Sequence, residues 1–175
     1  EEMVVFASET IATGPDSRVL LRFSDGSRFD LGASTQMLIK DYVYDDRETE
    51  GSLVTRIFQG TFRFVSGAVA RLRSRSMRVE LPVAVIGIRG TRVAGEASAT
   101  SALVVLLEPE TPGDTAIEVA NEYGSVVVDR PGWGTEVPDA ESPPSPPRRM
   151  RGDTLQRLNR SMQTLRRVIT PRMRP

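Results

Sequence analysis

The sequence predicts an all-β body, extending to Pro138, followed by a proline-rich linker and one amphipathic helix. Three observations support this fold class. Short runs rich in valine, isoleucine and phenylalanine are separated every few residues by glycine, proline, aspartate and serine, the pattern of brief strands joined by turns. No apolar pattern with the period of a helix competes in the body. The chain has 175 residues, 39% hydrophobic and 26% charged, enough for one domain with a core and an appendage.

The strands of the body follow from these runs and turns. Asp25-Gly26 is a strong hairpin signal, because this pair supports the positive φ angles of a type I′ turn. Residues 109–114 form a turn-rich loop, and Trp133 lies in the turn that closes the body. Strands are expected over residues 4–13, 19–23, 28–31, 37–44, 53–58, 61–65, 81–91, 102–107, 116–120 and 125–128. This spacing alone leaves a sandwich, a barrel or a short solenoid open.

A polar tip and a run of arginines interrupt the strand pattern. The tip Asp45–Glu50 holds four acids and could bind calcium, but it lacks the spaced acids of a dedicated loop, so a solvated hairpin tip is favoured. Alternation would place Arg71, Arg73 and Arg75 on one face of an extended segment, with Arg78 following. Such a ladder could meet phosphate or an acidic partner. A solvated edge that discourages strand-to-strand aggregation is the favoured interpretation.

The stretch Leu81–Thr91 is predicted to be a core strand around which the body is organised. Its β-branched residues fit a pleated, buried surface. Gly87 and Gly90 stand where a bulge, a bend or a close backbone approach is expected. Arg89 between them is a charge inside an apolar stretch, which needs a partner. We expect it to anchor a neighbouring loop, and contact with a ligand is the alternative.

The same stretch carries a family resemblance. Ala84–Thr91, with the sequence Ala-Val-Ile-Gly-Ile-Arg-Gly-Thr, resembles the signature of FecR domains, a periplasmic module named after the ferric citrate regulator. Gly87, Arg89, Gly90 and Thr91 are its signature residues. Further matching pieces lie in order at residues 19–27, 60–67 and 124–128, and Val93 departs from the family by replacing its usual aromatic residue. The resemblance implies that residues 1–138 form a β-solenoid-like sandwich.

The tail is expected to consist of a linker over residues 139–152 and an amphipathic helix over residues 153–170, with basic residues continuing to 175. A short helix carrying like charges must bury its apolar seam, so we expect it to dock, across a subunit boundary in a larger assembly. Its own body, a different protein and an anionic membrane surface are the alternatives. The predicted partner-binding residues are the seam Leu155, Leu158, Met162, Leu165 and Ile169, with Arg157, Arg160, Arg166 and Arg167 beside it.

The charges and the missing residue types limit the function. The segment from Arg148 onward carries a net charge of +8 and the body −8, and the acidic body opposes a nucleic-acid platform. Cysteine and histidine are absent, which removes thiol chemistry, disulfides, His–Cys zinc sites and the usual general base. We therefore expect no enzyme, no catalytic or metal-binding residues and no cofactor.

Three non-catalytic functions are considered. The first is a scaffold module of a periplasmic or cell-envelope assembly, with protein partners, as a homo-oligomer or part of a larger complex. The second is the relay that the FecR resemblance implies, from an outer-membrane iron-siderophore transporter to a sigma factor. It ranks second because no sigma-binding segment, spanning helix or additional transporter-contacting domain is recognised. Carbohydrate binding is a minor third, and membrane contact through the tail is less favoured. We expect a periplasmic or extracellular location after removal of a signal peptide.

Overall fold

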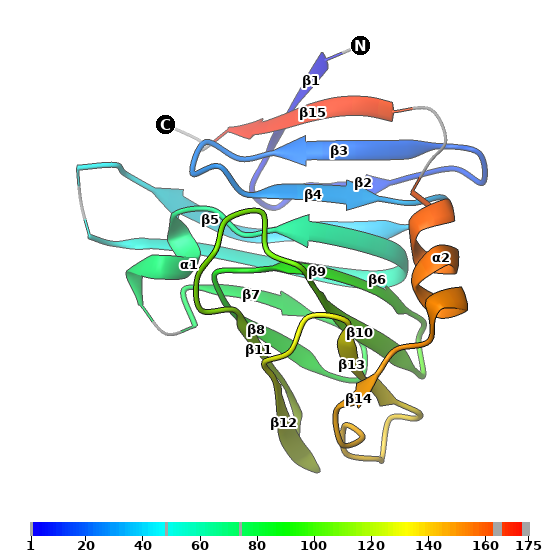
Figure 1. Cartoon of the computed structure of the whole chain (residues 1–175). Helices are drawn as coiled ribbons and strands as arrows, with labels where there is room; N and C mark the ends of the chain where they lie inside the picture. The colour runs from blue at the N-terminus through cyan, green and yellow to red at the C-terminus, as the bar shows by residue number, and fades with distance from the viewer. Residues whose placement is uncertain (1, 48, 74, 163–165, 173–175) are drawn as a thin grey trace.

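The structure of the chain, a computed structural model, describes residues 2–47, 49–73, 75–162 and 166–172 (Figure 1). In this part of the chain, fifteen strands form one curled sheet and two short helices pack against it. The helices are α1 (Val69–Leu72) and α2 (Gly152–Arg160). The strands are β1 (Glu2–Phe6), β2 (Thr10–Ala12), β3 (Arg18–Arg22), β4 (Arg28–Leu31), β5 (Gln36–Tyr44), β6 (Gly51–Val65), β7 (Met77–Glu80), β8 (Val85–Arg89), β9 (Arg92–Ala97), β10 (Ala102–Leu107), β11 (Ala116–Asn121), β12 (Gly124–Val128), β13 (Trp133–Val137), β14 (Arg148–Arg149) and β15 (Arg166–Arg172).

Strand β6 belongs to both halves of the curled sheet. Its first part pairs with β5 and β7, and its second part, from Gly60 onward, pairs with β4 and β9. Gly60 has a φ of +111°, a conformation that side chains rarely adopt, and a Cβ there would lie 2.5 Å from the Cα of Thr35. The two strands expected on either side of Gly60 are therefore one long strand that passes between two sheets.

The two halves of the curled sheet act as two sheets that share β6, and together they form the expected β-solenoid-like sandwich. One has the order β1-β15-β3-β4-β6-β9-β10-β13-β14, and the other β2-β5-β6-β7-β8-β11-β12. Phe29, Phe62 and Phe64 of the first sheet share one buried cluster with Ile86 and Ile88 of the second. Full burial of one such side chain contributes about 1.5–3 kcal/mol, so this shared cluster holds the sheets together.

The segment after β6 differs from the predicted arginine ladder. Residues 69–72 form the single-turn helix α1, because Val69 and Ala70 turn inward and are buried. The backbone N–H groups of Ala68 and Val69 donate to the main-chain and side-chain oxygens of Asp25, at 2.9 and 3.1 Å. These distant acceptors stabilise a turn that the local sequence does not favour, and the alternation of Arg71, Arg73 and Arg75 is lost.

The linker follows the body instead of leaving it. Strand β14 pairs with β13, and the Met150 N–H donates to the Gly132 carbonyl at 2.8 Å. The Ser142 carbonyl accepts from the side-chain amide of Asn121, also at 2.8 Å. Residues 139–151 therefore run along the sheet and deliver α2 to its outer face.

A helix was predicted over residues 153–170, but it ends at Arg160. The prediction is therefore wrong for the second half of this segment. Residues 166–172 instead form β15, which lies between β1 and β3 and is parallel to both (Figure 1). Val168, Ile169 and Thr170 are β-branched and fit a strand better than a helix. Hydrogen bonding to two neighbouring strands gives this segment more backbone partners than a frayed helix end. Of the two helices that the structure describes, neither is long and apolar enough to cross a membrane.

Candidate interaction site

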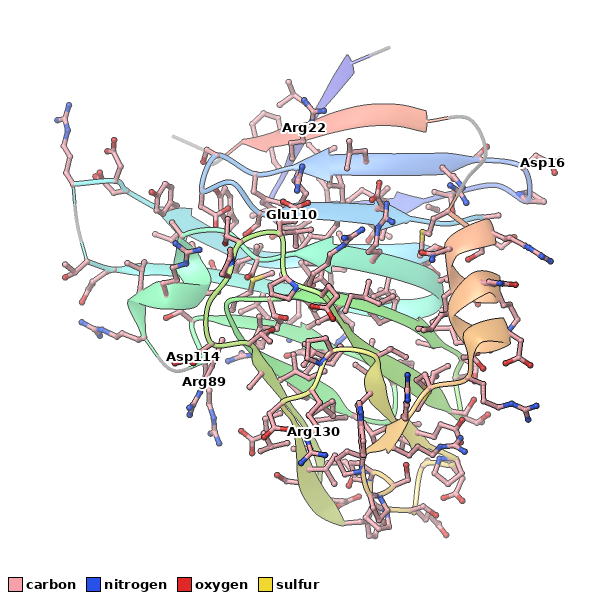
Figure 2. All side chains as sticks on the ribbon, in the orientation of Figure 1. Asp16, Arg22, Arg89, Glu110, Asp114 and Arg130 are labelled. Atoms are coloured by element: carbon pink, nitrogen blue, oxygen red, sulfur yellow. The ribbon has the colours of Figure 1, made fainter. Side chains whose placement is uncertain are left out.

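An open cleft of about 870 Å³ lies beside α1, and it is our candidate functional site. Three segments enclose it: α1 with the turn that follows, the corner between β8 and β9, and the loop 108–115 between β10 and β11. Asp114 and Arg89 lie close together below α1 in Figure 2. The lining residues are Ala70, Arg71, Leu72, Arg73, Arg89, Gly90, Thr111, Pro112, Gly113 and Asp114.

The hairpin turn after β3 positions α1. Asp25 is buried, and one of its side-chain oxygens accepts from the Ser27 hydroxyl at 2.8 Å and from the Val69 N–H at 3.1 Å. The Ser27 hydroxyl oxygen accepts from the Gly67 N–H at 2.8 Å. A Cβ on Gly67 would lie 2.3 Å from the Asp25 carbonyl, so only glycine allows this approach. The predicted hairpin is present and also clamps the start of α1, but its turn is not the expected type I′, because Gly26 has a positive φ of +88° and Asp25 does not.

The signature residue Thr91 positions the second wall. Its N–H donates to the Ser66 hydroxyl at 2.6 Å, and its hydroxyl makes a short hydrogen bond with that of Thr115 at the end of the loop 108–115. Gly90 has a φ of +63°, which glycine adopts readily, and this conformation allows the sharp change of direction between β8 and β9. The loop is also attached at Glu110, which is labelled in Figure 2 and accepts hydrogen bonds from Arg28.

Arg89 lies at the end of β8 and is exposed. Along β8, Ile86 and Ile88 point into the core, and the alternation turns Arg89 to the outside. From its place in an apolar stretch we expected Arg89 to anchor a neighbouring loop, but the alternation of the strand carries it outward, where it pairs with no other residue that the structure describes. The loop 108–115 is held instead by Thr91 and Arg28.

The cleft is predominantly cationic. Arg71, Arg73 and Arg89 line it, against the single acid Asp114 among the described lining residues. Arg73 forms an exposed ion pair with Glu50 at 3.1 Å. Neither Arg71 nor Arg89 forms an ion pair or side-chain hydrogen bond with another residue that the structure describes. The sequence identified these arginines, but only the folding of α1 against β8 brings Arg71 to Arg89.

The predicted tail residues lie elsewhere. Leu158 is 2% exposed and packs on Ala94, Leu103 and Val105, the outer face of β9 and β10, with Leu155 partly buried beside it. Met162 is also buried, Arg157 donates to Glu96, and the Arg160 carbonyl accepts from Arg18 at 3.1 Å. Leu165 lies outside the described residues, and Arg166, Arg167 and Ile169 belong to β15. The first half of the seam thus covers the chain's own sheet.

The part of the chain that the structure describes contains no candidate metal site. No group of three or more acidic, cysteine or histidine residues there is placed to hold an ion. Asp45, Asp46 and Glu50 of the acidic tip belong to that part, whereas Glu48 does not.

The fold defines an all-β sandwich module with an open arginine-lined cleft. The chain belongs to the FecR family: the model of this family, described as FecR protein, matches residues 9–110, more than half of the chain. This confirms the resemblance predicted from Ala84–Thr91, and the match includes α1, Arg89 and Thr91.

Two solved structures share the fold. Both are crystal structures, at 2.50 and 1.65 Å resolution, of a protein from Parabacteroides distasonis ATCC 8503 described as a "putative anti-sigma factor". Each is 13% identical to this chain, with a TM-score of 0.63 over 85% of it. The chain spans 62% and 63% of the length of those two structures. No curated protein is similar enough in sequence to count as a match.

Proposed function

We propose that the chain is a regulatory FecR-type module that acts by binding other proteins and catalyses no reaction. The observation that carries this proposal is the family match over residues 9–110. It covers two walls of the cleft, α1 and the corner between β8 and β9, whereas the loop residues that line the third wall, 111–114, lie beyond it. The anti-sigma description of the two proteins with this fold agrees with a regulatory function. These two observations favour the relay over the scaffold.

The proposed location is the periplasm or the outside of the cell, where FecR domains are placed by the resemblance. In such a relay the module receives a signal from an outer-membrane transporter and passes it toward a sigma factor. The open cationic cleft supports a protein partner, because it is wide and none of its arginines is buried. No cofactor is proposed.

Transcript measurement tests this function. In cells of the source organism, the gene is deleted and then restored on a plasmid, and transcripts that depend on extracytoplasmic sigma factors are quantified with and without an iron-siderophore. We expect at least one sigma-dependent set of transcripts to change on deletion and to recover on restoration. Unchanged transcripts in every sigma-dependent set, under both conditions, would exclude the regulatory function.

The scaffold function remains a second proposal, and the tail distinguishes it. Packing of Leu158 on the chain's own sheet explains an ordered α2 without a subunit boundary. The mass in solution of the full chain should be compared with that of a chain ending at Asp139. An oligomer that dissociates on truncation would support the scaffold. A monomeric full chain would exclude self-assembly through the tail.

A further inference from the structure

A second hollow adjoins the cleft on the outer face of the β8–β11–β12 sheet. It measures about 250 Å³ and shares Arg89 with the cleft, so the two hollows meet at that side chain. Strand pairing places Gly87 of β8 opposite Glu118 of β11, and Glu118 opposite Val127 of β12. Gly87 is therefore the floor of this hollow, which we call the Gly87 groove. It is lined by Arg75, Gly87, Ile88, Arg89, Ala116, Ile117, Glu118 and Val127.

The interior of the protein does not require a glycine at position 87. Its φ is not among the positive values of the chain, and an added Cβ would have the Glu118 carbonyl oxygen, at 4.0 Å, as its nearest neighbour. Gly95 is the opposite case, since a Cβ there would lie 2.6 Å from the Leu103 carbonyl oxygen. Glycine within a strand costs about 0.5–1 kcal/mol, and it often marks a place where a ligand or another backbone approaches closely. We therefore attribute the glycine at position 87 to its outer face, where the missing side chain leaves room for another molecule to approach the backbone.

Three arginines border the path from the cleft to the groove. Arg71, Arg75 and Arg89 are exposed, and none of them forms an ion pair or a side-chain hydrogen bond with another described residue. Arg75 has a φ of +69°, a conformation that costs a residue with a side chain about 1–3 kcal/mol. Glu118, the acid of the groove, accepts a hydrogen bond from the Ser125 hydroxyl at 3.0 Å. The free positive charges can therefore receive carboxylates from outside.

The far wall of the groove is apolar. Val127 is 58% exposed, and Val85, on the same outward face, is 38% exposed. A helix about 10–12 Å across is too thick for a hollow of this size, whereas an extended chain can lay single side chains into it. The exposed Val127 also favours a peptide over a small anion, because a peptide can bury an apolar side chain against it and a small anion cannot.

We infer that the cleft and the Gly87 groove together bind an extended acidic segment of a partner protein. Its carboxylates pair with Arg71, Arg75 and Arg89, its backbone crosses Gly87, and an apolar side chain packs on Val127. This inference rests on the proposed function only in that the partner is a protein. It names the surface and the chemistry of the regulatory contact.

The test is a selection of peptides on the full chain. A random-peptide phage library is enriched on the immobilised protein, and synthetic peptides of the enriched sequences are measured by calorimetry. We expect acidic sequences with interspersed apolar residues. The double variant Arg75→Glu/Arg89→Glu should bind them at least about tenfold more weakly, and so should Gly87→Val, whose methyl groups fill the groove. Arg149→Glu, an exposed arginine on β14 with the same change of charge, should bind as the wild type does.

Two results would overturn the inference. The first is enrichment of sequences without excess acid, or of acidic sequences whose binding is indifferent to both Gly87→Val and the double variant. The second is binding of inorganic phosphate alone that depends on Arg75 and Arg89 and displaces the peptide, which would make this a small-anion site. Unfolding midpoints of all variants show whether a loss of binding reflects the surface or the fold.

The same variants separate this inference from the proposed function. If gene deletion alters sigma-dependent transcripts but the chromosomal Arg75→Glu/Arg89→Glu variant does not, the regulatory function stands and this surface is not its contact. If deletion alters nothing, the regulatory function fails, and the peptide measurement still decides whether the surface binds acidic segments.

Discussion

Ser66 and Thr91 hold each other by two reciprocal hydrogen bonds. The Ser66 N–H donates to the Thr91 carbonyl at 2.9 Å, and the Thr91 N–H donates to the Ser66 hydroxyl at 2.6 Å. The pair joins the end of β6 to the corner that follows Arg89. It places one wall of the cleft, and the Thr91 hydroxyl extends the connection to Thr115. The signature residue Thr91 thus has a structural function at the border of the site.

Replacing the serine of this pair should destabilise the protein. Ser66→Ala leaves the Thr91 N–H without its acceptor in a buried corner, so we expect the free energy of unfolding to fall by about 1–3 kcal/mol. Urea denaturation followed by fluorescence of Trp133 measures it. Ser17→Ala, at an exposed turn, is the control and should change the value by less than about 0.5 kcal/mol. Equal effects of the two variants would contradict the assigned function of the pair.

Removing the carboxylate that clamps α1 should be more damaging. Asp25→Ala deletes the acceptor of the Ser27 hydroxyl and of the Ser27 and Val69 N–H groups, all in a buried place. We expect a loss of about 2–4 kcal/mol. Hydrogen exchange at Val69 should accelerate more than exchange at Ile86 in the central sheet. Asp16→Ala, in an exposed turn, should leave both amides protected, and unchanged exchange at Val69 in Asp25→Ala would show that the clamp is dispensable.

Two glycines in strands should respond oppositely to alanine. Gly95→Ala forces a Cβ to within 2.6 Å of both the Leu103 carbonyl oxygen and the Phe62 ring, so a loss of about 1–3 kcal/mol or more is expected. Gly87→Ala meets no atom closer than 4.0 Å and should be neutral or stabilising by up to about 1 kcal/mol. Thermal unfolding of both variants against the wild type tests this contrast. A large loss of stability in Gly87→Ala would show that the fold itself requires glycine at this position.

Glu80 should make stability depend on pH. Burial alone would raise its pKa, but hydrogen bonds and positive charge from Lys40 and Arg56 outweigh burial and hold the pKa below its usual value. Because the pKa of Glu80 is lower in the folded than in the unfolded protein, its carboxylate stabilises the fold at pH values above the unfolded-state pKa of about 4.3. This stabilisation is lost as the pH falls through the folded-state pKa. The difference in unfolding free energy between the wild type and Glu80→Gln should therefore be large at neutral pH and shrink in acid. A difference that is independent of pH would contradict the pairing.

The packing of α2 can be tested at its most buried residue. Leu158→Ala removes a side chain that is 2% exposed against Leu103 and Val105, and we expect a loss of about 2–5 kcal/mol. Leu155→Ala, at a partly buried position of the same helix, is the matched control and should cost less. If Leu158→Ala instead leaves the fold unchanged and abolishes binding to another protein, the helix has a partner outside its own chain.

The places where prediction succeeded and failed share a physical cause. The position of the Asp25-Gly26 hairpin was predictable because aspartate and glycine at adjacent positions favour a turn, although the turn is not type I′. The hydrogen bond from the Val69 N–H to the Asp25 carboxylate joins residues 44 positions apart and could not be predicted locally. The helix α1, which this bond stabilises, was therefore not predicted. The helix start was predicted at residue 153 and lies at Gly152, whereas its end at Arg160 depends on the pairing of residues 166–172 with β1 and β3.

The sequence by itself determined the all-β class, the hairpin at Asp25-Gly26, the family signature around Arg89 and the absence of cysteine and histidine chemistry. These are properties of composition and of short-range turn and strand preferences. Only the tertiary structure decided that Arg89 is exposed, that it lines the cleft with Arg71 and the adjoining groove with Arg75, and that Gly87 leaves this groove open toward Val127. Such juxtapositions arise from strand pairing and burial between distant residues, and a local pattern carries no record of which strands become neighbours.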